Sequence, residues 1–344
     1  MAARLSVLIS ASEAIPKKFL EKILQDLIVD RDTPSPLRRK CIQALVALPD
    51  SVLNNSRNVG DVAGTPIEFI HDGFKGTEGP IALPDGALAF TETQAARITR
   101  VNADGSIGLY LDNTNGANGL AFNADGDLIA VQTADPKVGV LAPAAHAHTL
   151  ADGYEGAHFG RPNDVVVDRK GGIYFTDSGV APKEGQPAPA PKAVYYVSPA
   201  GKLQRIASDI ERPNGIQLSP DEKTLYVANT DGEYLLAYEV QGEGRIGARR
   251  NFARLAGWAK GQNGNFASGA DGLAVDDSGR VYVATNVGIE VFSPAGAALG
   301  VIALPRKPQN LAFAGQDKKS LYVVGRGAVY RIALQAGGYR GRAK

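Results

Sequence analysis

Several features that would narrow the function of a protein are scarce in this sequence. Its 344 residues include one cysteine, Cys41, so an intramolecular disulfide and a cluster of thiolate metal ligands are both excluded. The formal net charge is +1, which offers no global attraction to nucleic acid or to a membrane surface. No apolar run approaches the roughly 18 residues of a membrane-spanning helix, and no G-x-S-x-G motif of a serine hydrolase is present. We therefore expect a soluble protein without a nucleic-acid or membrane partner.

The first residues, MAARLSVLISASEA, contain one arginine and a short apolar run. This run lies at the lower length limit of a signal peptide. We expect mature sequence here and a cytoplasmic protein, with a periplasmic or secreted location left open.

Glycine is absent from the first 50 residues, and all 40 glycines of the chain lie after them. Apolar residues recur at helical spacing between Phe19 and Ile28, and Ser35 followed by Pro36 is a typical start for a second helix through about Leu48. We predict an N-terminal helical hairpin over residues 1–60 and a separate domain over 61–344. The apolar face of the hairpin must be buried on that domain or on a second subunit, which would give a homo-oligomer.

The glycine-rich part repeats six times. Each repeat has a polar residue, a short strand, a D-G or D-x-x turn and a second strand. The repeats are EGPIALPDGALAFTET, NGLAFNADGDLIAVQT, NDVVVDRKGGIYFTDS, NGIQLSPDEKTLYVANT, DGLAVDDSGRVYVATN and NLAFAGQDKKSLYVVG. A period near 40–50 residues with paired strands is typical of a β-propeller with about four strands per blade. We predict an all-β, six-bladed β-propeller, in which the strand at 66–73 pairs with the last blade and closes the ring.

Equivalent positions of the blades should lie at equivalent places around the central channel. The residue that opens each repeat would then form a ring of oxygen-bearing side chains. The six residues are Glu78, Asn118, Asn163, Asn214, Asp271 and Asn310. Hard oxygen ligands with two negative charges suit a divalent cation, Ca²⁺ before Mg²⁺ or Mn²⁺. Each residue alone also has a structural explanation, because Asn and Asp often cap turns before a strand.

Four motifs resemble the gluconolactonase/regucalcin family, also called senescence marker protein. They are TEGP at 77–80, RPND at 161–164, PNGIQLSPDEKTLYVANT at 213–230 and ADGLAVDDSGRVYVAT at 270–285. The resemblance covers about residues 65–333 and implies a six-bladed lactonase with one catalytic divalent cation, Ca²⁺ first, with Mg²⁺, Mn²⁺ or Zn²⁺ also open. It implies Glu78, Asn163, Asn214 and Asp271 as metal ligands, and Arg161 as a contact to substrate oxygens.

The chain departs from the family pattern at two places in blade one. Ala82 lies where the family often has tryptophan, and FTET replaces the common F-T-D ending. These departures concern the lining of the substrate pocket more than the metal ligands.

The implied reaction is hydrolysis of a small cyclic ester such as a sugar lactone. Asp271 is the candidate general base or nucleophile, and Arg161 would bind sugar hydroxyls or the new carboxylate. Asn118 and Asn310 would hydrogen-bond water or substrate. Asp164 would either orient Asn163 or Arg161, or cap a turn or strand with its carboxylate. Two alternatives stay open: the same metal site could hydrolyse another ester or an organophosphate, or the chain could be a non-enzymatic metal-binding propeller.

Two further segments carry expectations. The proline-rich stretch 178–193 is either a lid over the channel mouth or a plain surface loop. The terminal YRGRAK is expected to be a solvated basic tail.

Overall fold

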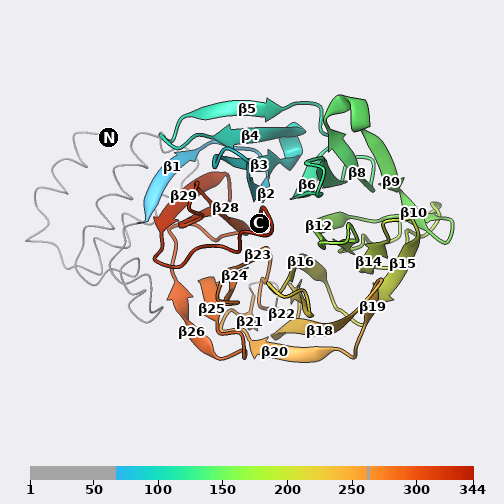
Figure 1. Cartoon of the computed structure of the whole chain (residues 1–344). Helices are drawn as coiled ribbons and strands as arrows, with labels where there is room; N and C mark the ends of the chain where they lie inside the picture. Colours follow the sequence, from blue (N-terminus) through green and yellow to red (C-terminus); the bar gives the residue numbers. More distant parts are fainter. Residues whose placement is uncertain (1–66, 262–263) are drawn as a thin grey trace, which may run out of the picture.

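The computed structural model describes residues 67–261 and 264–344, and these form six antiparallel sheets around a central axis (Figure 1). Each sheet is one blade of a β-propeller, so the predicted all-β, six-bladed architecture is confirmed. The helical hairpin predicted over 1–60 lies outside the described residues, and so does the oligomer contact assigned to it. No helix in the described ranges has the length and hydropathy needed to cross a bilayer.

In the first four blades, the strands follow one another along the chain from the innermost strand at the axis to the outermost. Blade one has β2 (Thr77–Ala82), β3 (Leu88–Glu92), β4 (Arg97–Val101) and β5 (Ile107–Leu111). Blade two has β6 (Ala117–Phe122), β7 (Leu128–Gln132), β8 (Lys137–Ala142) and β9 (His148–Ala151). Blade three has β12 (Pro162–Val167), β13 (Ile173–Asp177), β14 (Ala193–Val197) and β15 (Leu203–Ala207). Blade four has β16 (Pro213–Leu218), β17 (Thr224–Asn229), β18 (Tyr234–Gly242), β19 (Arg245–Ile246) and β20 (Arg250–Arg254).

The last two blades complete the circle. Blade five has β23 (Leu273–Val275), β24 (Val281–Thr285), β25 (Gly288–Phe292) and β26 (Ala298–Ile302). Blade six has β27 (Asn310–Ala314), β28 (Ser320–Gly325), β29 (Ala328–Ala333) and β1 (Glu68–Asp72). The short pairs β10 (Gly153–Tyr154) with β11 (Ala157–His158), and β21 (Ala259–Lys260) with β22 (Phe266–Ala267), lie in loops between blades, and two 3₁₀ turns span Thr93–Ala95 and Ala144–His146.

The ring is closed by pairing between distant parts of the chain. Strand β1 pairs antiparallel with β29, with Glu68 opposite Arg331 and Asp72 opposite Ala328. The strand predicted at 66–73 therefore does supply the outer strand of the last blade. This pairing satisfies the backbone groups of both strand edges, which would otherwise be open to other chains.

The hydrophobic core lies between blades rather than inside one sheet. One cluster packs Val131 of blade two with Phe175 and Tyr195 of blade three. Tyr282 and Phe313 join blades five and six, with their ring centroids 5.2 Å apart. Each blade thus buries both faces against its neighbours. The short strands are therefore apolar almost throughout, and the polar residues among them become informative.

The C-terminal segment is not a solvated tail, and that expectation was wrong. Figure 1 places the end of the chain at the centre of the ring. Ala82, at the end of β2, donates its N–H to the carbonyl of Ala343 at 2.9 Å, and Lys344 is buried. The basic side chains of this segment find partners in the channel, and these partners replace the water that a surface tail would have used.

Candidate functional site

The six residues of the predicted ring lie at one level of the channel. Four of them are the second residue of the innermost strand of their blade, Asn310 is the first residue of β27, and Asp271 precedes β23 by two residues. The innermost strand of every blade contacts that of the next blade around the whole circle. The structure therefore brings together all six residues that the repeats placed in register.

A repeated irregularity turns these residues toward the channel. In blades one to four, the pairing between the first and second strands shifts by one residue just after the ring position, as between Glu78 and Ile81 or between Pro162 and Val165. Such a bulge bends the strand and redirects the side chain at its start. The same bulge in four blades explains why polar residues can open strands that are otherwise apolar.

Glycine after the ring residue lets neighbouring blades approach closely. A Cβ atom on Gly79 would lie 1.9 Å from the carbonyl oxygen of Asn118, and one on Gly272 would lie 1.9 Å from Oδ1 of Asn310. Gly79 also has a φ of 45°, which side chains disfavour. The E-G and D-G pairs of the repeats therefore set the spacing between successive ring residues.

Two carboxylates lie at this level and share an unfavourable environment. Glu78 accepts hydrogen bonds from Gln309 Nε2 at 3.1 Å and from Asn310 Nδ2 at 3.2 Å. Burial raises the pKa of Asp271 to about 6, although Lys307, Arg326 and Arg212 partly offset this effect.

The two carboxylates influence each other. Burial, and then the charge of Asp271, raises the pKa of Glu78 well above its ordinary value. When both groups are ionised they repel each other, which adds to the cost of burying them. A divalent cation between them would remove this cost.

Amide oxygens at the ring lack partners within the described residues. Asn118 Oδ1 and Asn214 Oδ1 are buried and accept no hydrogen bond, while Asn214 donates through Nδ2 to Thr230 Oγ1 at 3.0 Å. Thr230 in turn donates to the carbonyl of Ala270 at 2.7 Å, which fixes which end of the Asn214 amide carries the free oxygen. A buried oxygen with no donor is costly unless a ligand satisfies it.

This donor set fits a hard divalent cation. Glu78 and Asp271 supply charge, Asn214 supplies an oxygen without a partner, and Asn163 is buried beside them in β12. All of these are oxygen donors, as Ca²⁺ prefers. Two of the four donors, Asn163 and Asn214, are amides. The described residues contain no group of three or more His, Cys, Asp or Glu side chains placed to hold a metal ion.

Arg161 is exposed in the loop before β12, and its backbone is held rigidly. Its N–H donates to Asp177 Oδ1 at 2.7 Å, and Gly160 N–H donates to Asp177 Oδ2 at 2.8 Å. Asp177 ends β13 and is fully buried. In blade one the same position is Glu92, which accepts the N–H of Lys75 at 2.9 Å. The FTET departure therefore keeps the loop anchor with a longer acid.

Two roles suggested by the sequence look different in the structure. Asn310 uses both ends of its amide, because Nδ2 donates to Glu78 and Oδ1 accepts the N–H of Leu311 at 2.9 Å. Asp164 does not contact Asn163 or Arg161 through its side chain; it accepts the N–H of Val165 at 3.0 Å and pairs with Lys344. The bond to Val165 fits the alternative of a strand-capping carboxylate, and the orienting role of Asp164 stays a prediction.

Sequence reasoning missed the cations around Asp271. Lys307, Arg212 and Arg326 all lower the pKa of this carboxyl, and Lys307 also donates to Asn286 Oδ1 at 2.6 Å. They come from two connections between blades and from the β28–β29 turn, and they belong to no repeated motif, so no spacing in the sequence predicted them. They make this side of the mouth positive.

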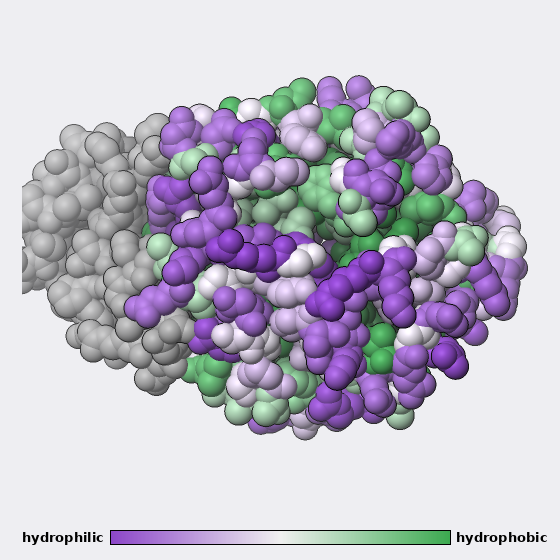
Figure 2. Space-filling view, viewed as in Figure 1, coloured by the Kyte–Doolittle hydropathy of each residue, from purple (hydrophilic) through white to green (hydrophobic). Residues whose placement is uncertain are grey.

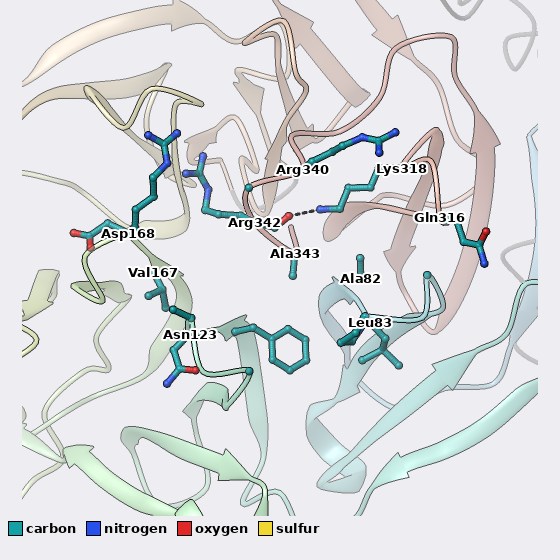
Figure 3. A pocket seen from close by; sticks show the side chains of 18 of the residues that line it. Ala82, Leu83, Asn123, Val167, Asp168, Gln316, Lys318, Arg340, Arg342 and Ala343 are labelled. Atoms are coloured by element: carbon teal, nitrogen blue, oxygen red, sulfur yellow. Dashed lines mark hydrogen bonds between the residues drawn. The ribbon is translucent and has the colours of Figure 1, made fainter.

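Two cavities flank the channel. One of about 640 Å³ lies at the end away from the ring and is lined by turns of blades one, two, three, four and six and by residues 340–343 (Figure 3). Figure 2 shows hydrophilic side chains across the middle of the molecule beside a partly apolar hollow. The other, of about 420 Å³, lies between the proline-rich loop, Glu211, Arg212 and Asp231. The loop thus borders the ring side of blade four, and its role as a lid stays a prediction.

Comparison with known proteins gives this geometry a family. Residues 76–326 match the model of the SMP-30/Gluconolactonase/LRE-like region. The chain belongs to this family. The matched segment runs from the start of blade one into blade six and includes the six ring residues.

Relatives and solved structures agree with this assignment. The chain is 25% identical to a gluconolactonase of Zymomonas mobilis over 88% of this chain and 98% of the relative. A gluconolactonase structure from Xanthomonas campestris matches with a TM-score of 0.70 and 28% identity, covering 82% of this chain and 94% of the other. A calcium-binding regucalcin from Agrobacterium tumefaciens, at 19% identity and a TM-score of 0.65 over 80% and 95% of the two chains, shares the fold.

Proposed function

We propose that this protein is a divalent-metal-dependent hydrolase that opens a sugar lactone or a similar small cyclic ester. The observation that carries the proposal is the ring of Glu78, Asn163, Asn214 and Asp271, with one unsatisfied amide oxygen and two carboxylates of raised pKa. The gluconolactonases at 25% and 28% identity support the substrate class. Ca²⁺ is the first candidate for the cation because all four donors are oxygens.

These four residues would hold the cation, which when bound polarises the lactone carbonyl and lowers the pKa of a water molecule. Asp271 accepts a proton from the attacking water. The hydroxyl group adds to the carbonyl carbon, the bond from that carbon to the ring oxygen breaks, and Asp271 returns the proton to the departing oxygen. The product is an open hydroxy acid.

Arg161 and Asn118 would position the substrate. Arg161 is exposed on a loop whose backbone Asp177 holds, and it offers a planar set of donors to hydroxyls or to the new carboxylate. Asn118 Oδ1 is buried at the ring without a donor and suits a substrate hydroxyl. The contact of Asn310 with water or substrate stays a prediction, since this residue holds Glu78.

A panel of aldonolactones tests the proposal. Hydrolysis is followed by proton release after chelation and after addition of Ca²⁺, Mg²⁺, Mn²⁺ or Zn²⁺. We expect activity that returns with a cation, is lost in Asp271→Ala and persists in Asp125→Ala, which changes an exposed acid at the β6–β7 turn. Cation binding without hydrolysis of any lactone would favour a different ester, an organophosphate or a non-enzymatic role. Activity that survives chelation would contradict the metal dependence.

A further inference from the structure

The C-terminal segment Tyr339–Lys344 enters the channel from the end opposite the ring. Tyr339 donates its N–H to the carbonyl of Val275 at 3.2 Å, and Gln217 Nε2 donates to the carbonyl of Lys344 at 3.3 Å. With the bond from Ala82 to Ala343, the segment is tied to the innermost strands of blades one, four and five. It therefore closes this end of the channel as a built part of the propeller.

Cations hold the segment in place. Arg342 Nη1 pairs with Glu222 Oε1 at 3.1 Å, and its Nη2 donates to the carbonyls of Leu218 at 2.5 Å and Ser219 at 3.0 Å. Lys318 Nζ donates to the carbonyls of Tyr339 and Arg342, the second of which is drawn in Figure 3. Arg342 and Lys318, which line the cavity of about 640 Å³, thus pair with groups of the same chain and anchor the segment.

The anchored segment places the ammonium group of Lys344 next to the ring. Lys344 Nζ contacts Asp164 Oδ2, and the two side chains are only 5% and 0% exposed. Asp164 follows Asn163 in β12 and stands where four of the other five repeats have glycine; its Oδ1 lies close to Gly119, which follows Asn118. A buried carboxylate at this level is strongly unfavourable unless a cation accompanies it.

The charges of this pair act on the ring. Asp164 raises the pKa of Glu78 and Asp271, while Lys344 lowers that of Glu78. Because Lys344 pairs with Asp164, the carboxylates of Glu78 and Asp271 remain to balance the charge of one divalent cation.

We propose that Lys344 is a positioning residue that sets the charge of the ring, so that the site matches one divalent cation, while Tyr339–Lys344 closes the channel beneath it. This inference rests on the metal site of the proposed function. A purely structural pair would leave cation affinity unchanged or weaken it in either variant, whereas a charge-setting pair moves affinity in opposite directions in the two variants.

The test is calorimetric titration of Ca²⁺ into chelated, full-length protein at about pH 7.5. Lys344→Met removes the ammonium group and should tighten binding on the order of tenfold, or add a second bound cation. Asp164→Asn keeps the shape but removes a negative charge, and should weaken binding on the order of tenfold. The double variant should return close to wild type, and Lys202→Met, an exposed lysine, should change nothing.

The outcomes separate this inference from the proposed function. If wild type binds no divalent cation, both the metal site and the inference fail. If wild type binds Ca²⁺ but both single variants bind within about twofold of it, or both bind more weakly, the metal site stands and the role of Lys344 is overturned. If Lys344→Met does not fold, the isosteric Asp164→Asn decides, since unchanged affinity there contradicts the inference.

Discussion

Replacing Asp271 with asparagine should stabilise the metal-free protein at neutral pH. Burial raises the pKa of this carboxyl to about 6, against an ordinary value of 3.8, so the folded state favours its protonated form. A difference of about two pKa units corresponds to roughly 3 kcal/mol at about 1.4 kcal/mol per unit. Asparagine mimics the protonated form and avoids this penalty.

The difference in stability between Asp271→Asn and wild type depends on pH. Below about pH 3.8 the carboxyl is protonated in both the folded and unfolded states and imposes no penalty. As the pH rises through about 6, wild type loses stability from this group because the folded state must give up a proton that it binds more tightly. The advantage of Asp271→Asn should therefore be absent near pH 4 and full above about pH 7.

Thermal unfolding in chelator measures the effect. At roughly 2 °C per kcal/mol for a domain of this size, Asp271→Asn should melt about 4–6 °C higher than wild type near pH 7.5 and at the same temperature near pH 4. Saturating Ca²⁺ should reverse the order, because about 1,000-fold excess over Kd adds about 4.1 kcal/mol to wild type alone. A variant that melts lower than wild type in chelator near pH 7.5 would refute the reasoning. It would show that Lys307, Arg212 and Arg326 stabilise the charged carboxylate more than burial penalises it.

Three other predictions concern the ring and its supports. Binding of Ca²⁺ should release protons to the buffer, because burial and the charge of Asp271 raise the pKa of Glu78 in the metal-free protein and a bound cation lowers it; equal binding enthalpies in buffers of different ionisation enthalpy would argue against this. Asp177→Ala frees the backbone of Gly160 and Arg161 and should raise KM for a lactone more than it lowers kcat, while Asp125→Ala serves as the control in the same assay. Gly79→Ala should lower stability by at least about 2 kcal/mol in denaturant unfolding, because its Cβ would meet the carbonyl oxygen of Asn118, and Gly126→Ala, in open space at a similar positive φ, should cost less.

Local patterns in the sequence account for the architecture. Each repeat carries its own strands and turn, and six copies bury their faces only against one another, so the blade number and the closing strand at 66–73 follow from the repeats. The ring follows for the same reason, because residues such as Asn118 and Asn214 occupy one register position in equivalent strands. The helical hairpin has no repeat to support it and lies outside the described residues.

Contacts between residues far apart in the sequence could not be predicted from the repeats. Lys344 meets Asp164 across 180 positions of the chain, and nothing near either residue marks the pair. The cations around Asp271 come from unrelated loops, and the amide of Asn310 is taken up by Glu78 because blades six and one meet there.

The sequence by itself determined six blades, a closed ring and the level at which the polar residues gather, because these depend on short-range periodicity repeated in register. Only the tertiary structure decided which of those residues keep a free oxygen, which carboxyl groups have a raised pKa and where the basic end of the chain lies. Those properties depend on burial and on partners that the channel brings together from distant parts of the chain, and no local spacing encodes them.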